Sequence, residues 1–470
     1  MNLTLLFPEG VAAGVLLLLI VAELTKRSSW ITAMAGAFLV FLSVLPFAGR
    51  FEAAFGTMFI LDPLAVFFKA FFALILFILI PMSREFFARP ATQTRSSEFL
   101  LILWSSLLGF FFLVSANDFL LLFIGLEVVT LSFYILTAYL KRDRSSTEAG
   151  LKYLILGSLA SAFLIYGISL LYIASGSTAL PDVRDAFVRD PGSKLILLGM
   201  LFILSGLGFK AASVPFQLWV PDVYEGAPTP VVAYLAVGSK AAAFALLLRL
   251  LFTVFIPFDS GRALLFSTLA TMTLVYGNLA ALRQTNIKRL FGYSSIAHAG
   301  YLLIGLAVGK ERGAAALLYY LMAYAVSNLA AFFVITLAGR ALQSDRIADY
   351  RGLAKRSPFL AVVLFTAFLS LAGVPPMAGF FGKFLILLAA VQSNLAWLAL
   401  LGALGVALAL YYYLSVVRVM YFEEPAQDSA IPLSLFSKFL LLVLVLGILI
   451  LGVWQAPFLD FARKAAGSLF

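Results

Sequence analysis

Residues 194–219 read KLILLGMLFILSGLGFKAASVPFQLW, and this stretch decides the kind of fold to expect. It is apolar and long enough to cross a bilayer as a helix, which takes about 20 residues. It nevertheless carries Lys210 well inside it, followed by Pro215. A lysine and a helix-breaking residue in one apolar run indicate a membrane helix with a function inside the bilayer.

The composition of the whole chain agrees with a membrane fold. Of 470 residues, 63% are hydrophobic and 12% are charged, whereas a soluble domain has roughly a quarter charged residues. The apolar runs are continuous and do not alternate, which excludes a transmembrane barrel. The chain has no cysteine and a single histidine, His298, so no haem, zinc or iron–sulfur site is expected on it. There is also no Gly-rich phosphate loop.

Hydropathy predicts an all-α integral membrane protein with about fourteen transmembrane helices. The predicted spans lie near residues 9–24, 30–48, 63–82, 98–115, 117–139, 149–174, 194–219, 228–252, 262–281, 287–308, 314–340, 357–393, 395–421 and 435–455. The net charge of +10 is concentrated in short loops, as the positive-inside rule describes, and does not indicate nucleic acid. The loop charges favour an N-terminus on the outside of the membrane.

We expect one membrane domain, residues 1–470, because no linker or large polar insertion divides the chain. Within it, we distinguish three N-terminal helices (1–97), a first inverted repeat (98–252), a second inverted repeat (262–421) and a C-terminal helix (422–470).

An internal similarity supports the two repeats. The seventh span combines Lys210 with Pro215, and the twelfth combines Pro375 and Pro376 with Lys383. These spans lie five apart, so one copy would be inverted relative to the other. Inverted repeats with broken helices at corresponding positions are a sequence indication of a transport site. The alternative is that Pro and Gly are common in membrane helices generally.

Four charged residues lie too deep in predicted spans to reach the interface: Glu127, Lys210, Lys240 and Lys383. A charge at the bilayer centre costs about 2.5–3.5 kcal/mol, so each needs a reason. A structural ion pair would explain two of them and leave two lysines unpaired. A buried lysine can store a proton, because burial disfavours the ammonium and a nearby carboxylate favours it. We therefore hypothesise that Glu127 switches Lys210, and that Lys240 passes the proton toward Lys383.

Other ionisable residues are less decisive. Lys152 lies near the start of the sixth span, where snorkelling and a role as second partner of Glu127 are both open. His298, in the tenth span, is either a packed, hydrogen-bonded residue or a proton carrier between Lys240 and Lys383. We expect Lys69, Arg249 and Asp118, which are close to predicted span ends, to be interfacial or to face loops.

Three blocks of sequence resemble a known family. They read FKAASVPFQLWVPDVYEGAPTPV at 209–231, QTNIKRLFGYSSIAHAGY at 284–301 and LAGVPPMAGFFGK at 371–383. Together they are similar to the antiporter-like subunits of respiratory complex I (NADH-quinone oxidoreductase), and the resemblance covers nearly the whole chain. The chain is most like subunit N, because its eighth span has no histidine, unlike the L and M relatives and cation antiporter subunits.

The resemblance implies fourteen helices, with spans four to eight and nine to thirteen as inverted repeats and helices seven and twelve broken. It implies that Glu127 and Lys210 form a coupled pair, that Lys240 is the central relay and that Lys383 is the terminal site. The implied function is proton translocation by a membrane-arm subunit of NADH:quinone oxidoreductase, which couples quinone reduction to proton pumping.

The same resemblance places the cofactors and partners. It implies no cofactor, metal or redox chemistry on this chain, with flavin and iron–sulfur clusters on partner subunits. The partners would be other membrane-arm subunits, including other antiporter-like subunits, in a bacterial cytoplasmic (inner) membrane. Three alternatives stay open: a Na⁺/H⁺ antiporter subunit, a transporter of a small organic solute, and a scaffold that does not pump.

Overall fold

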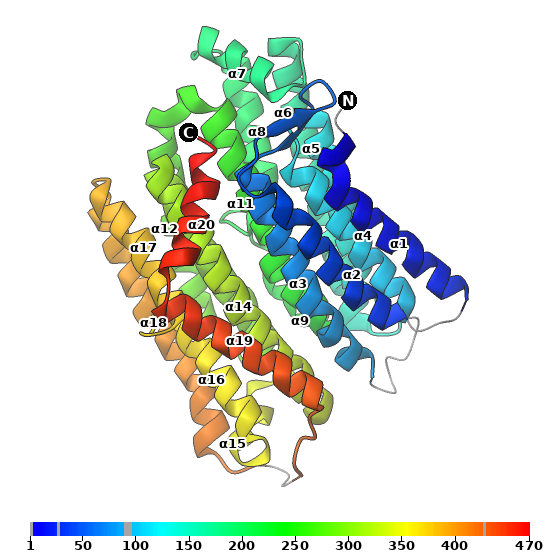
Figure 1. Cartoon of the computed structure of the whole chain (residues 1–470). Coiled ribbons are helices and arrows are strands. Elements are labelled where there is room, and N and C mark those ends of the chain that lie inside the picture. Colours follow the sequence, from blue (N-terminus) through cyan, green and yellow to red (C-terminus); the bar gives the residue numbers. More distant parts are fainter. Residues whose placement is uncertain (1–2, 26–28, 89–95, 426–428) are drawn as a thin grey trace.

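The computed structural model describes residues 3–25, 29–88, 96–425 and 429–470, and these are almost entirely helical (Figure 1). Thirteen helices in the described ranges are long and apolar enough to cross a membrane. Two shorter apolar helices, Pro358–Ala372 and Ala378–Gln392, occupy the position of the twelfth predicted span. The prediction of an all-α membrane protein with about fourteen spans is therefore confirmed.

The N-terminal part contains three helices and a small hairpin. Helices α1 (Phe7–Leu24) and α2 (Ser29–Val44) precede the antiparallel strands β1 (Glu52–Ala54) and β2 (Phe59–Leu61). Helix α3 (Pro63–Phe87) follows at once, and its first turn is capped by Asp62, which accepts a hydrogen bond from the backbone N–H of Ala65 at 2.8 Å. Such a cap satisfies a backbone donor that the helix itself leaves free.

The next part of the chain contains α4 to α11. Its helices are α4 (Ser96–Val114), α5 (Phe119–Thr137), α6 (Arg144–Ser175), α7 (Leu180–Arg189), α8 (Lys194–Ala211), α9 (Trp219–Gly226), α10 (Thr229–Tyr234) and α11 (Lys240–Arg249). Two π-helical segments, η4 (Leu235–Ser239) and η5 (Leu250–Val254), flank α11. Helix α7 is short and amphipathic, and the span from Thr229 to Val254 is continuous.

The remaining part contains α12 to α20. Its helices are α12 (Asp259–Ala281), α13 (Ile287–Val308), α14 (Lys310–Leu342), α15 (Leu353–Arg356), α16 (Pro358–Ala372), α17 (Ala378–Gln392), α18 (Ala396–Phe422), α19 (Leu435–Val453) and α20 (Ala456–Gly467). Figure 1 shows α12, α17 and α18 on one side of the molecule and α1, α2 and α4 on the other, with α11, α14 and α3 between them.

The helical structure is interrupted at both Lys–Pro motifs. Between α8 and α9, Ala212 has a left-handed backbone (φ 61°) and Pro215 has no N–H to donate. Between α16 and α17, Gly373 has φ 95°, which glycine adopts without steric cost. The peptide bonds Val214–Pro215 and Pro375–Pro376 are both cis.

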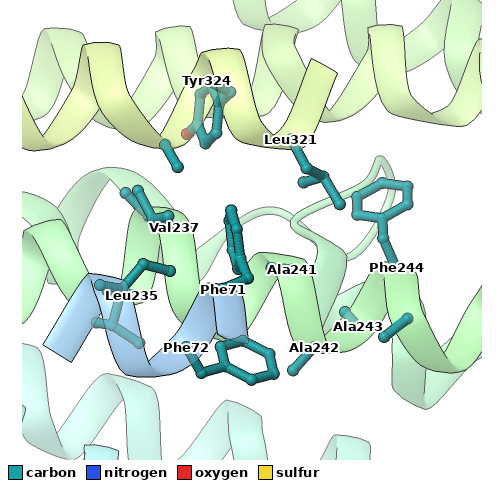
Figure 2. Close-up of a cluster of buried hydrophobic side chains, with 14 of the residues drawn as sticks. Phe71, Phe72, Leu235, Val237, Ala241, Ala242, Ala243, Phe244, Leu321 and Tyr324 are labelled. Carbon is teal, nitrogen blue, oxygen red and sulfur yellow. The ribbon is translucent and has the colours of Figure 1, made fainter. Parts of the chain in front are cut away.

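The buried centre consists of the helices that carry the functional candidates. Every residue in the most apolar stretch of Thr229–Val254 is buried inside the protein, and the share of buried residues in the corresponding stretch is 94% for Ile287–Val308 and 89% for Lys310–Leu342. The share of buried residues is 33% for Thr4–Leu24 and for Leu435–Val453, so these helices are peripheral. Figure 2 shows part of this centre, where Phe71 and Phe72 of α3 and Leu321 and Tyr324 of α14 face Leu235 to Phe244.

Candidate functional site

Glu127 lies on α5 and is half-buried. Its Oε1 accepts a hydrogen bond of 2.6 Å from the hydroxyl of Ser161 on α6. A close helix contact fixes this region, because a Cβ on Gly125 would come within 2.8 Å of the backbone nitrogen of Leu113 on α4. Small residues allow helices to approach in this way in membranes.

Lys210 lies in the last turn of α8, directly before the break, and is buried. Its ammonium donates a 2.6 Å hydrogen bond to the hydroxyl of Thr130, three residues after Glu127 on α5. The rings of Tyr134 and Tyr153 lie 6.0 and 5.7 Å from Nζ, measured to their centroids. Lys210 thus lies beside the α5 turn that carries Glu127, but the ion pairs in the described ranges do not join these two residues.

Lys240 begins α11 directly after the π-helical segment η4 and is buried. It donates to the hydroxyl of Ser295 on α13 at 2.6 Å and also contacts the Ser295 carbonyl oxygen. The same hydroxyl bonds to Tyr224 of α9 at 3.0 Å and to Tyr324 of α14 at 3.1 Å. A hydroxyl can donate one hydrogen bond and accept others, so Ser295 connects Lys240 to two tyrosines.

His298 lies one turn after Ser294 and Ser295 on α13 and is buried among tyrosines. Its Nδ1 is 2.5 Å from the hydroxyl of Tyr320 on α14, and its Nε2 is 3.5 Å from that of Tyr413 on α18. Tyr413 also bonds to Ser294. The structure therefore surrounds His298 with hydroxyls, in line with a packed histidine and equally with a proton carrier.

Lys383 lies on α17 just after the second break and is buried. Its ammonium donates to the carbonyl oxygens of Leu371 (2.8 Å) and Ala372 (3.0 Å), at the end of α16, and lies 4.6 Å from the ring centroid of Tyr301. The carbonyl end of a helix attracts positive charge. Lys383 is thus held by backbone carbonyls alone, whereas Lys210 and Lys240 each also bond to a side-chain hydroxyl.

These lysines share one electrostatic property. None of the ion pairs among the described residues includes Lys210, Lys240 or Lys383. A structural role would be expected to give a buried ammonium a carboxylate partner.

Lys152 pairs with carboxylates other than that of Glu127. It forms ion pairs of 2.7 Å with both Asp222 of α9 and Glu148 of α6, at a half-exposed position, so pairing with Glu127 is not what the structure shows. Asp222 also pairs with Arg289 at 2.7 Å. Asp222 lies outside the membrane-spanning helices. Burial favours a higher pKa for its carboxyl, but the hydrogen bonds from Lys152 and Arg289 outweigh burial and lower that pKa.

Neither Lys69 nor Arg249 faces a loop or solvent, because both side chains are buried. Lys69 is completely buried and lies 2.6 Å from Glu9 of α1. Arg249 is also buried and binds both carboxylate oxygens of Asp62, at 2.9 and 3.0 Å. Two opposite charges within apolar runs, Glu9 and Lys69, were the sequence signal for such a pair, but hydropathy does not show which helices touch.

Asp118 lies at a helix end, as expected, although it is buried. It caps α5 through a 2.7 Å bond from the N–H of Leu120 and accepts a second bond from Thr178. Over the described ranges, no group of three or more His, Cys, Asp or Glu residues could hold a metal ion.

Comparison with known proteins now places the chain. Residues 116–409 match the model of the NADH:quinone oxidoreductase/Mrp antiporter transmembrane family. The chain belongs to this family. The matched region is more than half of the chain and includes Glu127, Lys152, Lys210, Lys240, His298 and Lys383.

Individual family members are similar over most of their length. NADH-quinone oxidoreductase subunit N of Heliobacterium modesticaldum is 42% identical over 88% of this chain and 87% of its own. A chain of respiratory complex I from Thermus thermophilus has a TM-score of 0.81 and 32% identity, covering 97% of this chain and 98% of that one. A chain of the Mrp complex from Dietzia sp. has a TM-score of 0.84 over 100% and 98% of the two chains, but at 20% identity this shows the fold alone.

Proposed function

We propose that this chain is the proton-translocating membrane-arm subunit of an NADH:quinone oxidoreductase and acts as its subunit N. One observation carries the proposal: Lys210, Lys240 and Lys383 are buried in a membrane protein, and no ion pair within the described part of the chain includes them. A buried ammonium without a carboxylate can lose its proton at low cost, because burial disfavours the charged form. Identity of 42% to a subunit N supports this over the antiporter alternative.

The mechanism begins at Glu127. Its present partner is Ser161, and the present partner of Lys210 is Thr130, one turn away on the helix of Glu127. A movement of Glu127 toward Lys210 would favour the charged lysine, and its withdrawal would favour proton release. Glu127 is half-buried, so a charge change in a neighbouring subunit could drive this movement.

The released proton would pass to Lys240, then by way of the hydroxyls around Ser295 and His298 to Lys383. Moving one charge against 100 mV costs about 2.3 kcal/mol, which is within the range of a carboxylate–lysine interaction of about 4 kcal/mol at 4 Å near a protein surface. Lys152 is better described in this proposal as part of the ion-pair cluster with Asp222 and Arg289 at the edge of the site.

The assembly follows from the proposed identity. The partners are other membrane-arm subunits, including other antiporter-like subunits, while flavin and iron–sulfur clusters belong to partner subunits. We place the protein in the bacterial cytoplasmic membrane with its N-terminus outside, as the loop charges favour. The chain forms one membrane domain in which residues 98–252 and 262–421 are inverted repeats, each with one of the two helix breaks.

The test is quinone reductase activity and proton uptake in membranes that carry Lys210→Ala, beside a Lys240→Ala variant. If the complex assembles, electron transfer and pumping should fall together in both variants. Wild-type levels of both activities in the assembled complex would support a scaffold role and reject the proposal.

A further inference from the structure

The hydrogen bonds of Lys210 and those of Lys240 do not connect the two lysines. The hydrogen bond of Lys210 leads to Thr130 on α5, and those of Lys240 lead to Ser295 on α13. A proton that moves from Lys210 to Lys240 therefore needs an intermediate group that can accept and donate it. Tyr153 of α6 lies next to Lys210 and is a candidate for this group.

Tyr153 is completely buried, and its ring centroid lies 5.7 Å from Nζ of Lys210. Its position is fixed by packing: the Trp219 ring lies 4.8 Å away and the Phe209 ring 6.0 Å away, between centroids. Trp219 is itself held by a 3.0 Å hydrogen bond from its indole N–H to the carbonyl oxygen of Phe209. The aromatic neighbours therefore leave the ring of Tyr153 little freedom to turn away.

The packing around Tyr153 also leads toward Lys240. The Trp219 ring that packs on Tyr153 lies 6.4 Å from the ring of Tyr224, between centroids. Tyr224 bonds to Ser295 at 3.0 Å, and Lys240 donates to the same Ser295 hydroxyl. The Tyr153 hydroxyl has no partner at hydrogen-bonding geometry within the described ranges. A buried hydroxyl of this kind is a site for ordered water.

We propose that the hydroxyl of Tyr153 relays protons between Lys210 and Lys240, through bound water on the Lys210 side and through Tyr224 and Ser295 on the Lys240 side. This inference rests on the proposed function. A hydroxyl suits the step because it accepts a proton at oxygen while it donates its own.

The transfer balances without any other reactant. An N–H bond of the Lys210 ammonium breaks and an O–H bond forms on water, which passes a proton to the Tyr153 oxygen. The original O–H of Tyr153 breaks as its proton moves to the neighbouring hydroxyls. The last transfer forms an N–H bond on the neutral amine of Lys240, and each oxygen ends with the number of protons with which it began.

The experiment is Tyr153→Phe in the full complex, with Tyr234→Phe as the matched control. Both variants remove one buried hydroxyl and keep the ring, but the Tyr234 hydroxyl accepts a 3.0 Å hydrogen bond from Ser106 on α4, whereas Lys210 and Lys240 bond to Thr130 and Ser295. Quinone reductase activity and proton pumping are measured in H₂O and in D₂O, with the amount of assembled complex determined for each variant. Lys210→Ala and Lys240→Ala are measured in parallel.

We expect Tyr153→Phe to assemble normally and to lower both activities by at least about tenfold, with a changed solvent isotope effect, while Tyr234→Phe stays near wild type. A merely structural role of the ring would leave the isotope effect unchanged, and this outcome would overturn the inference. If the lysine variants lose activity and Tyr153→Phe does not, the relay by Tyr153 is rejected and the proposed function stands. If the lysine variants also keep full activity, both are rejected.

Discussion

The ammonium of Lys240 lies 2.6 Å from the hydroxyl of Ser295, and it has this contact in place of a carboxylate. The hydroxyl stabilises the ammonium less than a counter-ion would, because it carries no net charge. It also connects Lys240 to Tyr224 and Tyr324. Lys240 is therefore both able to lose its proton and connected to groups that could carry it.

Replacing Ser295 tests this connection. Ser295→Ala should lower coupled quinone reduction and pumping several-fold, because Lys240 keeps its contact with the Ser295 carbonyl but loses the hydroxyl that connects it to both tyrosines. The measurement is turnover per assembled complex. The control is Ser83→Ala, which removes a buried hydroxyl that donates to the Leu79 carbonyl of its own helix. Equal activity in both variants would contradict the role of Ser295.

The exchange of partners by Glu127 gives a second prediction. Glu127→Gln keeps the shape and the possibility of a hydrogen bond to Ser161 but removes the charge that would attract Lys210. We expect activity to fall by about tenfold or more, whereas Ser161→Ala should keep more activity because the carboxylate remains. Proton uptake and quinone reduction are measured together. If Ser161→Ala lowers activity more than Glu127→Gln does, the charge of Glu127 is not required for proton transfer.

Lys152 is expected to contribute little to proton transfer. Its ion pairs with Asp222 and Glu148 are half-exposed, and pairs of this kind stabilise a protein by about 0–1 kcal/mol. Lys152→Met should therefore retain more than about half of wild-type turnover, clearly above Lys210→Met measured in the same membranes. A loss as large as that of Lys210→Met would place Lys152 in the proton pathway.

The pair Glu9–Lys69 is predicted to be structural, because each partner neutralises the other at a completely buried position. Glu9→Leu leaves a buried ammonium without its partner and should destabilise the protein by about 3–5 kcal/mol. The double variant Glu9→Leu, Lys69→Leu should recover most of this loss. Thermal unfolding of the purified complex measures both. A double variant as unstable as the single one would contradict the interpretation.

The spans could be predicted from sequence because each must cross lipid and so appears as a continuous apolar run. Lys210, Lys240 and Lys383 could be identified because charge in such a run is costly. Lys69 was missed for a physical reason. Its distance from a span end suggested an interfacial position, but α1 supplies Glu9 and the Phe59 ring of strand β2 lies 4.8 Å from its ammonium.

The hydroxyl contacts could not be predicted either. Thr130 and Lys210 are 80 positions apart, and Lys240 and Ser295 are 55 apart. Such contacts depend on which helices pack together, and a single sequence does not contain that information in its periodicity. The same limit applies to Lys152, whose partner Asp222 lies 70 positions away.

The central claim, that a buried lysine without a carboxylate partner exchanges a proton during turnover, is tested most directly at Lys240. The measurement is proton pumping by the assembled complex in sealed vesicles with Lys240→Arg. Arginine keeps the positive charge but does not release its proton in proteins. The account predicts that pumping and coupled quinone reduction both fall at least about tenfold, as they should in Lys240→Ala. Pumping at the wild-type rate with arginine at position 240 would contradict the claim, because a positive charge that releases no proton would then be enough for pumping.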